Sequence, residues 1–385
     1  MIRGVDDLLR RAVDNGDVPG VVAMAADAGR IIYSGAFGRR LLPNGAAMST
    51  DTIFWIASMT KAITSTAAMI LVEQGKLTLD APIRNVLPEL ATPQVLEGFS
   101  TDGTPKLRTT TVPITLRHLL THTSGFGYDI WNRDISRYRD TMGIPELMSC
   151  QNAALNMPLV SDPGAQWEYG IGIDWAGKAI ERVSGKTLQA FFDENLFGPI
   201  NMRDTAFRLT PERRNRLAAV HTRQDNGSLE PMEFELPQEP EFQMGGGGLY
   251  GTAGDYIAFQ QVFLNEGRGG STRILRPETV QLMGRDHIGR LNVRMLERSM
   301  PYSNDAEFFP GMVKKWGLAF MLNNQPVPGG RSANSLGWAG IFNTFNWVDP
   351  AKRIAGVLMT QILPFFDPKV IDLVEKFERA IYASL

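Results

Sequence analysis

Apolar residues near the start of the chain recur first at helical and then at strand spacing. Between residues 5 and 15 they fall on one helical face, and Gly16 follows as a stop signal. Residues 21–25 and 31–37 are two runs of β-branched and small apolar residues joined by a short turn. The pattern predicts an opening helix followed by a β-hairpin.

The end of the chain shows the same elements in the opposite order. Residues 342–348 and 354–360 form two apolar runs on either side of the turn sequence Asp-Pro-Ala-Lys. Residues 367–382 then carry apolar side chains at helical spacing. The pattern predicts a second hairpin followed by a closing helix.

The middle of the chain is mainly helical in pattern. Pro and Gly separate three helical stretches, at residues 115–120, 174–184 and 188–196. The simplest arrangement inserts a mostly helical domain, residues 77–208, into a sheet domain made of residues 1–76 and 209–385. We therefore predict an α+β fold whose sheet is built from both chain ends.

Composition limits the possible partners and the cellular location. The 385 residues are 43% hydrophobic and 21% charged, as in ordinary globular proteins, and the net charge of −2 gives no field to attract nucleic acid or an anionic membrane. There is no apolar run of about 18 residues, and the first twenty residues lack the apolar stretch of a secretory signal. With Cys150 as the single cysteine, no internal disulfide can form. We expect a cytoplasmic protein.

Ser58 and Lys61 form the most distinctive local pair. They lie three residues apart at the start of a predicted helix over residues 59–74, so their side chains share one face. The helix start adds free backbone N–H groups and the positive end of the dipole. A serine in this place gains a neighbouring base and a donor for an oxyanion. Because an S-x-x-K sequence also arises by chance, the pair needs support from other segments.

Four other segments supply that support. They are LLTHTSG at residues 119–125, WEYG at 167–170, the glycine run at 245–248 and GWAGI at 337–341. Together with the S-x-x-K pair they resemble the serine β-lactamase and penicillin-binding-protein superfamily, in its class C-like branch, and most closely the family VIII carboxylesterases. Tyr169 matches the tyrosine of the Y-x-N element, and Trp338-Ala339-Gly340 aligns with K-T-G.

The resemblance implies both a fold and a mechanism. The implied fold is that of the serine β-lactamases and D,D-peptidases: a central antiparallel sheet flanked by helices, an inserted mostly helical domain, and an active site in the cleft between them. Ser58 would be the nucleophile that forms an acyl-enzyme, with Lys61 and Tyr169 as general base and acid. Which of the two takes the serine proton stays open. The backbone N–H groups of Ser58 and Ile341 would form the oxyanion hole.

Two departures from the family pattern indicate the substrate class. Trp338 and Ala339 stand where a β-lactamase has Lys-Thr, and neither can hold a substrate carboxylate. Ile171 stands where the family's Asn would contact an acylamide. We therefore predict a carboxylesterase acting on small-molecule esters of short to medium acyl chain, with Trp338, Ala339 and Gly340 at the substrate.

The aromatic segment after Gly125 suggests the acyl pocket. Phe126, Tyr128 and Trp131 are predicted to wall it, and the alternative is that they are ordinary core residues of the helical domain. Substitution of Tyr128 and Trp131 by Ala would distinguish the two possibilities, because only pocket residues set the chain-length preference.

Other readings of the chain stay open at this stage. An acyltransferase would use the same acyl-enzyme with an alcohol as acceptor, and weak β-lactamase or D-Ala-D-Ala peptidase activity is a further alternative. A non-catalytic binding module that kept the fold is another. The oligomeric state is not predicted.

No metal or organic cofactor is expected. The glycine run fits G-x-G-x-x-G only formally, because no parallel strand precedes it, and its glycines more plausibly let the backbone pass close to the cleft. His118 and His122 lie four apart but lack an H-E-x-x-H pattern. We expect the His122 ring to cap backbone groups near Ser124.

Overall fold

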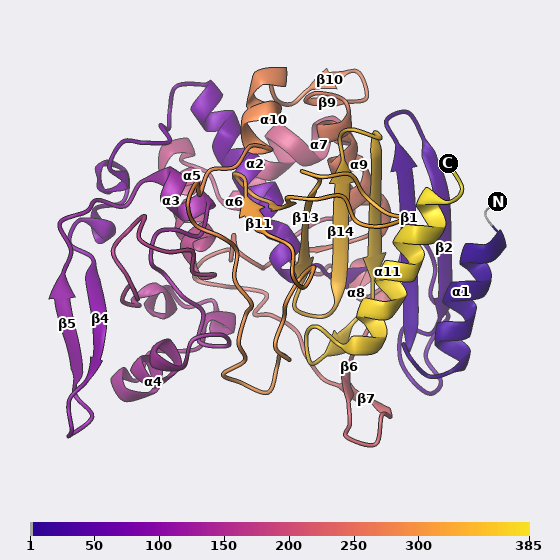
Figure 1. The fold of residues 1–385 in the computed structure, drawn as a ribbon, viewed down its shortest axis with the longest axis horizontal. Coiled ribbons are helices and arrows are strands. Elements are labelled where there is room, and N and C mark those ends of the chain that lie inside the picture. The colour runs from indigo at the N-terminus through magenta and orange to yellow at the C-terminus, as the bar shows by residue number, and fades with distance from the viewer. Residues whose placement is uncertain (1–2) are drawn as a thin grey trace.

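The two ends of the chain meet in one seven-stranded antiparallel sheet (Figure 1). The computed structural model describes residues 3–385. In spatial order the strands are β11 (Lys314–Trp316), β12 (Met321–Asn323), β13 (Leu336–Gly340), β14 (Thr344–Asp349), β15 (Ile354–Met359), β1 (Gly20–Asp27) and β2 (Ile31–Gly38). The pairing of β1 with β15 joins the N-terminal hairpin to the C-terminal one. Both predicted hairpins and the predicted α+β class are confirmed.

Helices cover both faces of this sheet. The predicted terminal helices are α1 (Arg3–Asp14) and α11 (Pro368–Tyr382), which pack on each other, and α11 crosses the front of the strands in Figure 1. Helix α9 (Ala253–Leu264) packs against β1 and β15 from behind. Because every residue of β14 and β15 is buried, these strands lack the apolar and polar alternation of a sheet with one wet face.

The region between the sheet segments is mostly helical, and most of it lies on the left of Figure 1. It contains the hairpin β4 (Gln94–Phe99) and β5 (Pro105–Thr109), followed by α3 (Leu116–Leu120), α4 (Arg133–Met142), α5 (Gly172–Ser184), α6 (Leu188–Phe192) and α7 (Gly198–Ile200). The helix predicted over 188–196 is α6 extended by a π-helical turn, Asp193–Phe197. Helix α5 packs on α3 and on α2 (Thr60–Glu73), and this joins the region to the sheet side. The domain limits at residues 77 and 208 stay a prediction.

Short elements complete the chain. Strand β3 (Phe54–Trp55) pairs with β8 (Tyr250–Gly251), and β9 (Arg268–Gly269) pairs with β10 (Thr272–Arg273). A small sheet contains β6 (Val220–Arg223), β7 (Leu229–Met232) and β16 (Ile362–Leu363), and the remaining helices are α8 (Pro211–Asn215) and α10 (Pro277–Met283). Among residues 3–385, no helix has the length and apolar character needed to cross a membrane.

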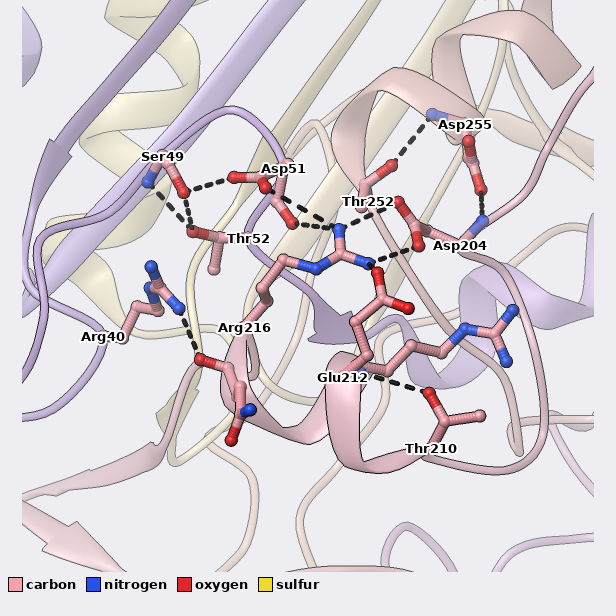
Figure 2. Close-up of polar contacts among 12 residues, drawn as sticks. Arg40, Ser49, Asp51, Thr52, Asp204, Thr210, Glu212, Arg216, Thr252 and Asp255 are labelled. Carbon is pink, nitrogen blue, oxygen red and sulfur yellow. Dashed lines mark hydrogen bonds and ion pairs between the residues drawn. The ribbon is translucent and has the colours of Figure 1, made fainter.

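A polar network around Arg216 anchors the segment that leads into β3 (Figure 2). The guanidinium donates two hydrogen bonds to the Asp204 carboxylate, at 2.9 and 2.5 Å, and a third to the Asp51 carbonyl at 3.1 Å. The exposed Glu212 adds a weaker contact at 3.4 Å. The Arg216 carbonyl accepts the Ile53 amide at 2.9 Å. The side chain and the backbone carbonyl of Arg216 therefore both bind the segment 51–53.

Candidate active site

Ser58 lies at the junction between β3 and α2. A single 3₁₀ turn, Ala57–Met59, joins the two elements, and α2 begins at Thr60. Ala57 has a φ of +45°, in the left-handed region that costs a non-glycine residue of order 1–3 kcal/mol. Such a turn places the serine hydroxyl at the N-terminal end of the helix, where the dipole favours developing negative charge. Ser58 is partly exposed and lines a cavity.

Lys61 is completely buried and lies one helical turn after Ser58. Its Nζ is 3.1 Å from the Ser58 Oγ, 2.9 Å from the Tyr128 hydroxyl and 2.5 Å from the Gly246 carbonyl oxygen. A neutral amine has two N–H donors and one lone pair. With the donors directed at Tyr128 and Gly246, the lone pair remains for the Ser58 hydroxyl. The geometry suits a lysine that accepts the serine proton.

Burial tunes the charge of this amine. Loss of solvent lowers the pKa of Lys61 to about 7, and the nearby Asp174 carboxylate opposes that shift. Burial also raises the pKa of Asp174, with Lys61 acting in the opposite sense. The pair is thus poised to change its protonation near neutral pH, as expected of a group that moves protons.

Tyr169 reaches the same point from the loop before α5. It shares a hydrogen bond with Ser58, and the Lys61 Nζ lies 4.9 Å from the centre of its ring. Burial raises the pKa of Tyr169, while hydrogen bonds with Ser58 and Trp338 oppose the shift. The resting phenol is therefore protonated, and it is suited to give a proton rather than take one.

The W-x-G segment of β13 contacts Tyr169 and the turn that carries Ser58, but it does not line the cavity. The Trp338 Nε1 donates to the Tyr169 hydroxyl at 2.8 Å, and both Trp338 and Ala339 are buried. A side chain on Gly340 would lie 2.5 Å from the Ile56 carbonyl oxygen, so only glycine lets β13 approach the nucleophile turn this closely. None of these three residues lines the cavity beside Ser58. Trp338 and Gly340 instead contact Tyr169 and the residues around the 3₁₀ turn, and the contact of these three residues with substrate stays a prediction.

Ile341, directly after β13, does line the cavity. No hydrogen bond from its backbone N–H to another residue of the described chain is present. An unpaired donor beside Ser58 is what an oxyanion hole requires.

The cavity beside Ser58 has a volume of about 70 Å³ and a mainly apolar wall. Tyr128 and Trp131 are part of that wall, as expected from the sequence. Phe126 is not: its buried ring stacks on Trp175, with ring centres 6.4 Å apart. Phe126 therefore packs in the core of the helical region, as in the alternative interpretation, whereas Tyr128 lines the cavity.

Several wall residues were not anticipated from the sequence. They come from β3, from the loop after α4, from the glycine run and from the long loop after α10: Trp55, Leu147, Met148, Met244, Met300 and Tyr302. The glycine run itself reaches the cavity through Gly246 and Gly247, in agreement with its expected position. Only the three-dimensional fold brings these segments together.

Two titratable residues near the site, His122 and Asp174, differ from what the sequence indicated. His122 does not cap backbone groups as expected: it is buried, and neither ring nitrogen has a hydrogen-bond partner among residues 3–385. Its ring packs on Tyr169 and Trp316, with centres 4.7 and 4.9 Å apart, and burial lowers its pKa well below the usual range. Asp174 was missed entirely. The only sequence signal was a carboxylate within the apolar run that opens α5.

Within the described chain, no group of three or more His, Cys, Asp or Glu side chains could hold an ion.

Comparisons with known proteins identify the family of the chain. A family model described as Beta-lactamase matches residues 5–378. The chain is 32% identical to the monacolin J acid methylbutanoyltransferase of Aspergillus terreus, over 99% of this chain and 95% of that protein. It is also 32% identical to the lovastatin esterase of Penicillium rubens, over 98% of both.

Solved structures show the same likeness. A LovD6 mutant of simvastatin synthase from Aspergillus terreus superposes with a TM-score of 0.88 at 31% identity, covering 100% of this chain and 97% of that one. EstCE1, a hydrolase with promiscuous acyltransferase activity, has a TM-score of 0.76 at 24% identity, covering 99% and 97%, and this likeness shows the fold.

Proposed function

This chain belongs to the Beta-lactamase family and is an enzyme of the serine hydrolase superfamily, and from this we propose that it is a carboxylesterase that transfers short acyl groups from esters to water through Ser58. The observation that carries the proposal is the contact of the Ser58 hydroxyl with a buried lysine whose two other hydrogen-bond partners are fixed. A nucleophile and its base meet beside an apolar cavity.

Acylation would begin with transfer of the Ser58 proton to Lys61. The serine oxygen attacks the ester carbonyl, and the N–H groups of Ser58 and Ile341 bind the oxyanion. Tyr169 gives its proton to the leaving alcohol and is reprotonated from Lys61. The Trp338 N–H stabilises the transient phenolate through its 2.8 Å hydrogen bond.

Deacylation would repeat these steps with water in place of the alcohol. As the water attacks the acyl-enzyme, Tyr169 passes its own proton to Lys61 and takes the proton of the water. The protonated Lys61 then gives a proton to the Ser58 oxygen as the acyl group leaves it. The charge on the site is restored, so the proton transfers balance with Ser58, Lys61 and Tyr169 alone.

The cavity wall supports a neutral, short acyl group. Its single cation, Arg139, is already bound by Asp129 and by Asp140, so it is not free for a substrate carboxylate. A volume of about 70 Å³ leaves room for only a few heavy atoms. We propose chains of about the length of a butyryl group.

An acyltransferase is the second candidate, and the comparisons support it at least as well as the esterase. The methylbutanoyltransferase and the lovastatin esterase have the same identity to this chain. Both chemistries need the same acyl-enzyme, and the acceptor alone differs.

The first test is turnover of p-nitrophenyl butyrate by wild type and by Ser58→Ala, with intact-mass detection of a butyrylated serine. The esterase proposal expects turnover that disappears in the variant. Added alcohols separate the two candidates, because an acyltransferase would form the new ester as main product at millimolar acceptor. No turnover and no acyl-enzyme from folded wild type would exclude both. Nitrocefin run in parallel measures any β-lactamase activity.

The cavity assignment is tested by acyl-chain preference. Trp131→Ala should enlarge the cavity and shift preference toward longer p-nitrophenyl esters, whereas Phe126→Leu should leave preference unchanged. Equal effects of the two substitutions would contradict the assignment.

A further inference from the structure

Asp174 is a fully buried carboxylate in the first turn of α5. One oxygen, Oδ1, accepts the Gly246 N–H at 2.8 Å. The other, Oδ2, has no hydrogen-bond partner in the described part of the chain. Buried carboxylates are normally saturated with donors, so a half-satisfied one is costly for folding and calls for another explanation.

Gly246 connects this carboxylate to Lys61. Its N–H binds Asp174, and its carbonyl oxygen accepts from the Lys61 Nζ at 2.5 Å. A Cβ at Gly246 would lie 2.4 Å from the Asp174 Oδ2, so the glycine backbone is pressed directly onto the carboxylate. The neighbouring Gly245 carbonyl accepts from the Thr64 hydroxyl of α2 at 2.7 Å. The glycine run therefore links α5 to the helix that carries Lys61.

The other titratable groups around the pair stay neutral at ordinary pH. From the loops before α4 and α5, Tyr128 and Tyr169 face Lys61, and burial raises the pKa of both. His122, after α3, has its pKa lowered by burial and by Lys61. Burial raises the pKa of Cys150, on the Asp174 side, to about 12. Among these groups, Lys61 and Asp174 are therefore the two that can carry a charge.

We propose that Asp174 is a positioning residue for Lys61: it holds the Gly246 backbone against the amine and supplies the negative charge that faces it. Asp174 does not touch the reacting atoms. It acts through the lysine, and the inference rests on the proposed function because it takes Lys61 as the base for Ser58. The carboxylate sets the pH at which that base becomes available.

The test is the pH dependence of Ser58 labelling by a fluorophosphonate, which reports serine activation without a natural substrate. Asp174→Asn keeps an oxygen for the Gly246 N–H and removes the charge. Loss of an opposite charge favours the neutral amine, so the rising limb of the labelling rate should move about one pH unit or more to lower pH. Asp255→Asn is the matched control: Asp255 lies in the first turn of α9 and accepts the Asp204 N–H at 2.8 Å. Its profile should match that of wild type.

Each outcome decides something different. A labelled Asp174→Asn protein with an unmoved limb would overturn the positioning role, and absence of labelling in wild type would overturn the proposed function itself. If Asp174→Asn does not fold, the reciprocal effect is measured by ¹³C NMR of the aspartate side chains in wild type and Lys61→Met. Removing the amine should raise the titration midpoint of the buried carboxylate, and an unchanged midpoint would contradict the proposal.

Discussion

The two polar networks on either side of the nucleophile turn differ in how completely their charges are paired. Arg216 donates two hydrogen bonds to the Asp204 carboxylate and has further contacts with Asp51 and Glu212 (Figure 2). Lys61 and Asp174 are more deeply buried, yet one carboxylate oxygen has no partner among residues 3–385 and the amine lies within hydrogen-bond distance of the reactive Ser58 hydroxyl. Fully paired charges fix a structure, whereas incompletely paired ones remain available for reaction.

Substitution of the buried Lys61 should have the largest effect, because it should abolish most of the activity while the protein still folds. Lys61→Met removes the proposed base and should lower kcat/KM by about 10² to 10⁴-fold, the usual contribution of general base catalysis. Far-UV circular dichroism and thermal unfolding should show that the variant folds. The control is Lys376→Met, at an exposed pair with Asp372 on α11. Activity within a few-fold of wild type in Lys61→Met would show that the lysine is structural.

Substitution in the Arg216 network should have the opposite effect: it should lower stability and leave the reactive groups unchanged. Arg216→Met removes charged hydrogen bonds from a side chain only 17% exposed, and should lower the free energy of unfolding by about 2 kcal/mol in urea titrations. The folded enzyme should keep its pH profile. Glu212→Gln is the control, since that side chain is 84% exposed and should change little. A shifted pH profile in Arg216→Met would mean that the two networks are electrically coupled.

This contrast also explains what the sequence could predict. The terminal helices, the hairpins and the Ser58–Lys61 pair follow from spacing along a few turns of chain, and the fold class followed from them. Asp174 and Met300 could not be assigned, because their roles depend on contacts with segments far away in sequence. Trp338 was placed at the substrate because its neighbours align with a binding motif, but its indole N–H is directed at Tyr169.

The indole contact offers a smaller effect within the reactive network. Trp338→Phe keeps most of the packing and removes the donor to the Tyr169 hydroxyl, so a phenolate would lose stabilisation. We expect kcat to fall about tenfold with KM nearly unchanged, since one hydrogen bond to a charged group is worth roughly 1.5–3 kcal/mol at most. Trp347→Phe is matched, because its Nε1 donates to the Tyr382 hydroxyl at 3.3 Å away from the site. A rise in KM with kcat unchanged would instead support the predicted contact between Trp338 and the substrate.

The pH dependence of activity and of stability around pH 7 should distinguish the two networks. Burial lowers the pKa of Lys61 to about 7, so the free amine accumulates as pH rises through 7 and is lost below it. Hence kcat/KM should be about half its plateau at pH 7 and fall tenfold for each further unit of acidity. In the other network Arg216 lowers the pKa of Asp204, and Asp204 raises that of Arg216, so neither changes charge in this range. Wild type and Arg216→Met should therefore differ in unfolding free energy by the same amount at pH 6 and pH 8. An activity plateau that extends unchanged to pH 5 would mean that Lys61 is not the group whose deprotonation starts the reaction.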